Sequence, residues 1–173
     1  MPAPNWTDIF GPPTRRSIFI SYHHQGDQGY YDRLVTTFSE SYELLRDNSL
    51  ERRIQSDNVE YILQRIREDY ITGSSCTLVL CGAETPWRKF VDWEIKATLD
   101  KEHGLIGVNL PSNPLNPSNT VNVPSRLYDN IQSRYAIWSN WTAINSDLTT
   151  LPSLIEQANN ASIELIRNHR PMM

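Results

Sequence analysis

The 173-residue chain has few of the residues that hold metals or form disulfides, with only two cysteines and four histidines. Cys76 and Cys81 lie in one apolar run typical of a strand, and their odd spacing places the two side chains on opposite faces. Because five residues of strand span about 16 Å, these thiols cannot pair with each other. His23 and His24 are adjacent and the other two histidines stand alone, which gives no metal-ligand spacing. We therefore expect two reduced core cysteines and no metal site.

Long apolar runs and excess positive charge are also missing from the sequence. No apolar run approaches the roughly 18 residues that cross a bilayer, and the first residues lack the layout of a signal peptide. The formal net charge of −4 argues against a nucleic-acid partner, which usually faces a basic surface. We expect a cytoplasmic protein that binds neither membranes nor nucleic acids.

The length of the chain suits a single domain, which at this size buries roughly 70% of its unfolded surface. Pro2, Pro4, Pro12 and Pro13 favour an extended arm at the start of the chain. We predict a flexible N-terminal arm over residues 1–14 and one domain over residues 15–173.

Apolar periodicity predicts strands that alternate with helices. The expected strands cover residues 17–22, 76–81, 105–110 and 135–138, and the expected helices cover residues 30–45, 57–73, 89–101 and 151–167. Residues 23–29 are expected to form a polar loop, and no strand is apparent in residues 46–57. The proline-rich residues 111–130 are predicted to be a loop without a full helix. This order predicts an α/β three-layer sandwich with a central, mainly parallel sheet that binds ligands beyond the carboxyl ends of its strands.

The motifs of several common α/β chemistries are absent. The turn after the first strand reads Ser21-Tyr22-His23-His24-Gln25-Gly26, without the Gly-x-Gly-x-x-Gly of dinucleotide redox domains. The phosphate-binding Gly-x-x-x-x-Gly-Lys-Ser/Thr loop and the Gly-x-Ser-x-Gly elbow of hydrolases do not occur either. The sequence therefore disfavours hydride transfer, P-loop nucleotide hydrolysis and serine-hydrolase catalysis.

Glu94 is an acidic residue on the apolar side of its predicted helix. At about 100° per residue, Glu94 falls among the apolar residues of helix 89–101, whereas Asp92 falls on the opposite side, where we expect solvent. Trp93 is expected to be partly exposed or to contact another subunit. Two interpretations of Glu94 remain open: a functional carboxylate at the ligand-binding edge of the sheet, or a structural ion pair with Arg88 or another cation.

Four stretches of sequence, in order along the chain, resemble the TIR family. Phe19-Ile20-Ser21-Tyr22 resembles its opening strand. Three further stretches resemble the TIR-like subfamily that includes the sensor subunit of Thoeris anti-phage systems. They are a strand ending in glycine at residues 77–82, a helix start of the pattern aromatic-Val-Asp-aromatic-Glu-Ile within residues 87–95, and a strand of the pattern Gly-Leu-hydrophobic-Gly at residues 104–108. The resemblance covers residues 16–110 and, more loosely, residues 124–141. It implies a TIR/flavodoxin-like fold, in which loop 111–130 replaces the usual helix between the last two strands.

The resemblance also implies cleavage of NAD, because Glu94 occupies the position of the glutamate that breaks the N-glycosidic bond in TIR enzymes. NAD⁺ would be the substrate, with no further cofactor, and the product a second messenger of the cyclic ADP-ribose type. The implied partners are a phage-derived trigger, a separate effector protein that the product activates, and further copies of the chain in a self-assembly.

One carboxylate suffices for this chemistry. Ordinary glycosidases need two because the leaving alcohol must be protonated, whereas the nicotinamide of NAD is already cationic and leaves as a neutral molecule. Glu94 would orient the ribose hydroxyls and stabilise the positive charge that develops on the sugar. The other residues expected to bind substrate lie beyond the strand ends: Ser21, Tyr22, His23, Gly82, Trp87 and Phe90. Each also fits a structural role as a cap, a core cover or an exposed side chain.

Two other functions stay open. A TIR-type module uses the same surfaces for assembly without chemistry, and a relative of the nucleoside deoxyribosyltransferases is an N-glycosidase with a similar sheet and a strand-end glutamate.

Overall fold

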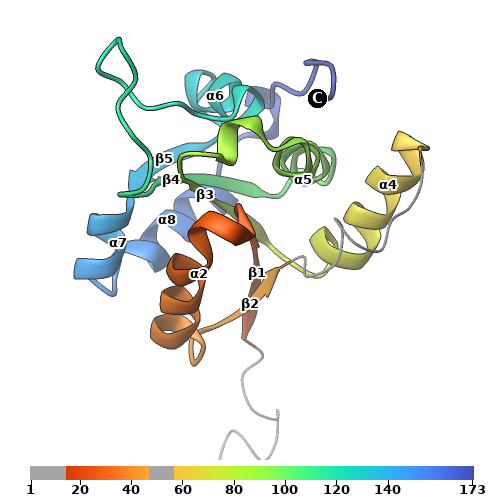
Figure 1. Ribbon diagram of the computed structural model, residues 1–173. Coiled ribbons are helices and arrows are strands. Elements are labelled where there is room, and N and C mark those ends of the chain that lie inside the picture. The colour runs from red at the N-terminus through yellow and green to blue at the C-terminus, as the bar shows by residue number, and fades with distance from the viewer. Residues whose placement is uncertain (1–14, 47–56) are drawn as a thin grey trace, which may run out of the picture.

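A computed structural model describes residues 15–46 and 57–173. In this part of the chain, five strands form one sheet in the order β2-β1-β3-β4-β5, and all neighbouring strands are parallel (Figure 1). The strands are β1 (Arg16–Ser21), β2 (Tyr42–Arg46), β3 (Cys76–Cys81), β4 (Gly104–Asn109) and β5 (Ile137–Asn140). The α-helices are α2 (His24–Phe38), α4 (Val59–Ile66), α5 (Lys89–Asp100), α6 (Ser125–Gln132), α7 (Trp141–Ser146) and α8 (Thr150–Asn159). The predicted arm over residues 1–14 lies outside the described residues.

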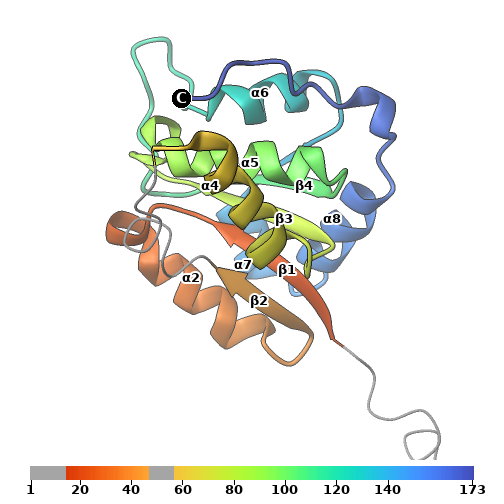
Figure 2. The same ribbon diagram turned by 90° about the vertical axis from the view of Figure 1, so that its right-hand side faces the viewer.

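Helices cover both faces of the sheet, which confirms the predicted three-layer α/β sandwich. Helices α2, α7 and α8 pack on one face, and α4, α5 and α6 pack on the other, where Figure 2 shows α4 and α5 in front of the strands. Side chains alternate along each strand, so Ile18 and Ile20 of β1 face α2 while Phe19 faces α4. Cys76 and Cys81 of β3 are buried in opposite layers as free thiols, as their spacing predicts.

The first half of the chain differs from the prediction at two elements. Helix α2 begins at His24, so residues 24–29 are helical and the expected loop is wrong. The helix ends at Phe38, and Tyr42–Arg46 form β2, which pairs along β1 from Arg16 opposite Tyr42 onward. Helical spacing of apolar residues misled the prediction here because pairing with a neighbouring strand overrides local preference.

The N-cap of helix α4 lies one residue after Asp57, the residue that the sequence predicts as the cap. Asn58 provides the N-cap, and its side-chain oxygen accepts a hydrogen bond from the backbone N–H of Tyr61 at 3.2 Å. The helix continues from Ile66 into a π-helical turn, η1 (Arg67–Ile71), and stops before Gly73 as expected.

The C-terminal half contains two helices that the prediction missed, α6 and α7. Helix α6 begins inside the stretch expected to be a loop and ends two residues beyond it, and it packs on α5, burying Arg126 and Leu127. The predicted last helix is α8, which ends at Asn159 rather than at residue 167, and it is followed by a short 3₁₀ turn, η3 (Ile163–Leu165). The prolines misled the prediction because Pro124 directly precedes α6, a position that leaves its helical hydrogen bonds intact.

The strand order places the topological switch point of the sheet between β1 and β3. The chain runs from β1 outward to β2 and then returns to β3 on the other side, so the connections leaving β1 and β3 turn in opposite directions. Open α/β sheets bind ligands at this point, beyond the carboxyl ends of the two strands. Ser21 ends β1 and Cys81 ends β3, which puts the predicted site residues at the same edge.

Candidate active site

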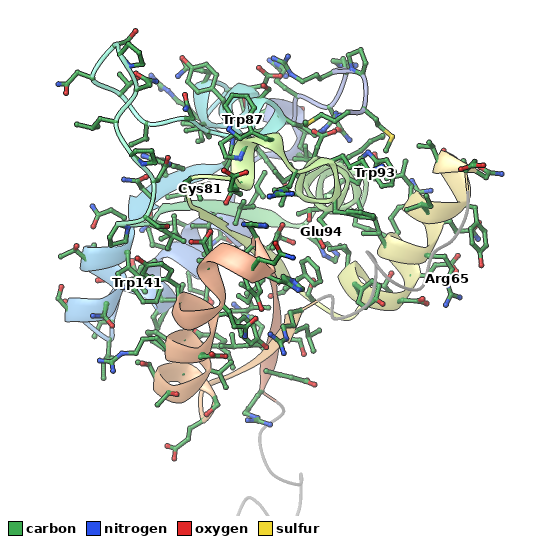
Figure 3. All side chains as sticks on the ribbon, viewed as in Figure 1. Arg65, Cys81, Trp87, Trp93, Glu94 and Trp141 are labelled. Atoms are coloured by element: carbon green, nitrogen blue, oxygen red, sulfur yellow. The ribbon has the colours of Figure 1, made fainter. Side chains whose placement is uncertain are left out.

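Glu94 lies on the buried side of α5, as the helical spacing predicts. It is 6% exposed, and the hydroxyl of Ser21 donates a hydrogen bond to its carboxylate. Figure 3 shows Glu94 between α5 and the N-terminal end of α2. The structure therefore joins the end of β1 to α5 through two of the predicted site residues.

A second polar contact, between Thr98 and Thr77, joins α5 to β3. The hydroxyl of Thr98 donates to the backbone carbonyl of Glu94 at 2.8 Å and lies 2.7 Å from the hydroxyl of Thr77 on β3. All three groups are buried, so each depends on the others for its hydrogen bonds. The ion pair of Arg88 is formed with Glu84, at 3.2 Å between Nη2 and Oε2, and the guanidinium is thus engaged outside the helix.

Asp27 is a second buried carboxylate at this edge of the sheet. It lies in the first turn of α2, is 2% exposed, and accepts a hydrogen bond from the Ser112 hydroxyl at 2.8 Å. Burial raises the pKa of the Asp27 carboxyl above its ordinary value, while the Ser112 hydrogen bond and the nearby His23 oppose part of that rise. Asp27 therefore links α2 to the loop that follows β4.

The absence of a side chain at Gly82 leaves room for the Asp27 carboxylate at the end of β3. A β-carbon at Gly82 would lie 2.1 Å from Oδ2 of Asp27, which is far inside van der Waals contact. The structure thus places Gly82 at the site edge as expected, with Asp27 filling the space beside it.

Tyr22 faces the opposite layer from Glu94. Its hydroxyl donates to Gln28 at 2.8 Å and accepts from Arg46 at 2.7 Å, and its ring stacks on those of His24 and Tyr31. Both the ring and the hydroxyl are thus engaged within the protein.

The remaining predicted residues surround the start of α2 and α5. His23 precedes α2 and is 9% exposed, and its Nδ1 is buried without a hydrogen-bond partner among the described residues. Trp87 ends the 3₁₀ turn η2 (Thr85–Trp87) and is 63% exposed, which leaves its ring open to stacking. Phe90 is half-buried one turn before Glu94, with its ring edge-on to Trp93 at a centroid distance of 5.3 Å.

Two expectations about the outer side of α5 are wrong. Asp92 is 4% exposed because it forms an ion pair with Arg126, with Nε to Oδ1 at 2.9 Å. Trp93 is 5% exposed and packs with the apolar residues of α4, so it is neither a surface residue nor a subunit contact. Both errors arise because α6, α4 and the C-terminal residues cover a side of the helix that local spacing assigns to solvent.

Asp27 and Ser112 were not among the predicted site residues. For Asp27 the sequence does carry a signal, since residues 27, 31, 34 and 38 recur at helical spacing and all four are buried on α2. Ser112 carries none, because its role depends on the position of the loop after β4.

The described residues contain neither a metal-binding cluster nor a membrane-spanning helix. No group of three or more histidine, cysteine or acidic side chains is placed there to hold a metal ion. Among the helices of residues 15–46 and 57–173, none has the length and apolar character needed to cross a membrane.

A buried glutamate, Glu94, thus lies beside the switch point of a five-stranded parallel sheet. A family model, described as the TIR-like domain of Thoeris protein ThsB, matches residues 19–114, which is more than half of the chain. The chain therefore belongs to the ThsB family of TIR-like domains.

The comparison with solved structures includes the TIR domains of a larger assembly. This chain is similar to the TIR domains in a structure of the activated Roq1 resistosome, which directly recognizes the pathogen effector XopQ. The similarity covers 85% of this chain and 86% of that chain, with 11% sequence identity and a TM-score of 0.41. The comparison with curated proteins gives no match.

Proposed function

We propose that this domain cleaves NAD⁺ at the bond between nicotinamide and ribose and releases a cyclic ADP-ribose type messenger. The observation that carries the proposal is the carboxylate of Glu94, buried at the β1–β3 switch point and held by the Ser21 hydroxyl. The family supports it, because the match to the ThsB model spans Ser21 and Glu94.

The reaction breaks the C1′–N bond, and its electron pair goes to the nicotinamide nitrogen. The positive charge moves from the pyridinium ring to the ribose, and in this proposal the Glu94 carboxylate stabilises it there. An adenine nitrogen or a ribose hydroxyl of the same molecule then bonds to C1′, and an attacking hydroxyl releases its proton to solvent. No general acid is needed, because nicotinamide leaves as a neutral molecule.

The residues around Glu94 divide into two groups in this proposal. Ser21 orients the carboxylate, and His23, Trp87 and Phe90 contribute to the walls around the substrate. Tyr22 and Gly82 act indirectly, Tyr22 by packing beneath the start of α2 and Gly82 by leaving room for the carboxylate on that helix.

The test is nicotinamide release from NAD⁺ by the purified protein, alone and with lysate from phage-infected cells. Glu94→Gln should remove at least about 99% of the product, as expected when a group that stabilises transition-state charge is lost. Glu164→Gln is the matched control, because Glu164 is exposed in η3 and far along the chain from the site. Absence of nicotinamide in both conditions would contradict the proposal.

Two further arms separate the other functions. Release of free base from nucleosides, but not from NAD⁺, would indicate a nucleoside N-glycosidase. Retained signalling by Glu94→Gln in cells would indicate an assembly module. We also propose that the domain acts in the cytoplasm, that phage infection triggers it, that self-assembly completes its pocket, and that its product activates a separate effector protein.

A further inference from the structure

Arg126 of α6 is the largest fully buried side chain among the described residues. Its Nε and Nη2 donate to the two carboxylate oxygens of Asp92 at 2.9 and 3.2 Å. Its Nη1 donates to the Asn168 side chain at 2.9 Å, and Nη2 also donates to the Pro171 carbonyl at 3.2 Å. The guanidinium therefore joins α5, α6 and the C-terminal segment, residues 166–173, in one contact.

The C-terminal segment follows the outer side of α5. The backbone N–H of Met173 donates to Asp92 at 3.2 Å, and the Trp93 indole donates to the Met173 carbonyl at 3.2 Å. Further along the helix, the Asn168 side chain donates to the carboxylate of Asp100 at 2.8 Å. Figures 1 and 2 both place the C-terminal end beside α5 and α6.

Helix α6 holds this segment from its other side. The Asn130 side chain donates to the Arg167 carbonyl at 2.7 Å and accepts from the Arg167 backbone N–H at 2.9 Å. Arg170 pairs with Asp129 through two hydrogen bonds of 2.9 Å each. The segment is thus fixed to α6 and spans the gap to α5.

Asp92 and Glu94 are two positions apart on α5, which places them about 200° apart around the helix. Asp92 is held by Arg126 on one side of the helix while Glu94 is held by Ser21 on the other. A helix fixed at both sides cannot rotate about its axis without breaking one of these contacts. The rotation of α5 therefore sets the direction in which the Glu94 carboxylate points.

We propose that Arg126 and Asp92, together with the C-terminal segment, are positioning residues that set the orientation of Glu94. This inference rests on the proposed cleavage of NAD⁺ for its kinetic consequence, and its geometric consequence is independent of any substrate. A displacement of a catalytic group by about 1 Å is enough to lower a rate by about a hundredfold.

The test replaces Arg126 by lysine, which keeps the charge and loses the planar fork that contacts both Asp92 oxygens. Arg126→Lys should lower kcat by about tenfold to a hundredfold and change KM by less than about twofold. In the same protein, the ¹³C resonance of the Glu94 carboxyl should move in the direction seen for Ser21→Ala. The control is Arg65→Lys, which weakens the ion pair between Arg65 of α4 and Asp69 of η1 and touches neither the C-terminal segment nor the Arg126–Asp92 pair, and it should leave both readouts unchanged.

Asn168→Ala is the second variant, because it loosens the segment while the Arg126–Asp92 pair remains, and it should shift the same resonance by a smaller amount. An unchanged Glu94 resonance in folded Arg126→Lys and Asn168→Ala would overturn the inference. So would a shifted resonance with wild-type kcat in an active enzyme. If the wild-type domain does not cleave NAD⁺, the proposed function fails, and the resonance alone decides whether these residues position Glu94.

Discussion

The carboxylate of Asp27 lies against Gly82 so closely that all three of its carboxyl atoms occupy the space of a β-carbon. The distances from that position are 2.1, 2.6 and 2.6 Å. A side chain at position 82 would therefore require the Asp27 carboxylate to move from its place beside the end of β3.

Gly82→Ala is expected to destabilise the domain by about 1–3 kcal/mol, because the new methyl group displaces the Asp27 carboxylate from its hydrogen bond with Ser112. Gly29→Ala is the matched control, since a β-carbon there meets nothing within 4 Å in the middle of α2. That variant should raise the free energy of unfolding by about 0.5–1 kcal/mol. Urea unfolding of both variants measures the difference, and equal stabilities would contradict the close packing at Gly82.

Asp27→Asn is expected to gain stability relative to wild type as the pH rises. Burial raises the folded-state pKa of Asp27, so the unfolded chain releases its proton at lower pH than the folded domain does. The free energy of unfolding of the wild type therefore decreases as the pH rises from the ordinary aspartate pKa to the raised pKa of the folded state, and it then levels off. Asparagine does not titrate but still accepts the Ser112 hydrogen bond, so unfolding at a series of pH values isolates this effect. A difference between the two proteins that is independent of pH would refute it.

Ser21→Ala is expected to cost about 1–3 kcal/mol and to lower NAD⁺ cleavage, because the buried carboxylate of Glu94 loses a hydrogen-bond donor. Ser17→Ala is the control on the same strand, since Ser17 donates to Glu43 at 2.8 Å at an exposed position. Its free energy of unfolding should change by less than about 0.5 kcal/mol. Thermal unfolding and nicotinamide release are the two measurements, and a Ser21 variant that matches the Ser17 variant in both would be inconsistent with the site described.

Asp92→Leu alone is expected to lower the free energy of unfolding by about 3–5 kcal/mol, because Arg126 would keep a buried charge without its partner. The double variant Asp92→Leu with Arg126→Met should lose less than the sum of the two single variants, since it removes both charges together. A double-mutant cycle from denaturant unfolding gives the coupling energy. Asp129→Leu with Arg170→Met provides the exposed pair for comparison, with an expected coupling below about 1 kcal/mol.

The local sequence pattern was sufficient to predict an element where that element is buried on both faces or is clearly amphipathic. The apolar run at β3 and the spacing of α5 predicted both elements within a residue, and Glu94 followed from the same spacing. These elements form the centre of the sheet and a helix that packs on one of its faces, which is why the class of fold and the main candidate residue could be predicted.

The errors occur where a distant segment decides the structure. Strand β2 depends on pairing with β1, and the burial of Asp92 depends on Arg126, which lies 34 positions along the chain. Trp93 is covered by α4 and by the last residue of the chain. No local rule contains such contacts, so a helical projection can assign a buried ion pair to solvent.

The two thiols of β3 report on the two layers of the sandwich separately. Cys76 is buried beneath α2 and α8, whereas Cys81 is buried on the side of α5 and α6. Burial raises the pKa of the Cys76 thiol to about 12 and also raises that of Cys81, so neither reacts at neutral pH until its layer opens. Alkylation of the folded protein therefore times the opening of each helical layer independently, and equal rates at the two sites would show that both layers separate from the sheet in one cooperative event.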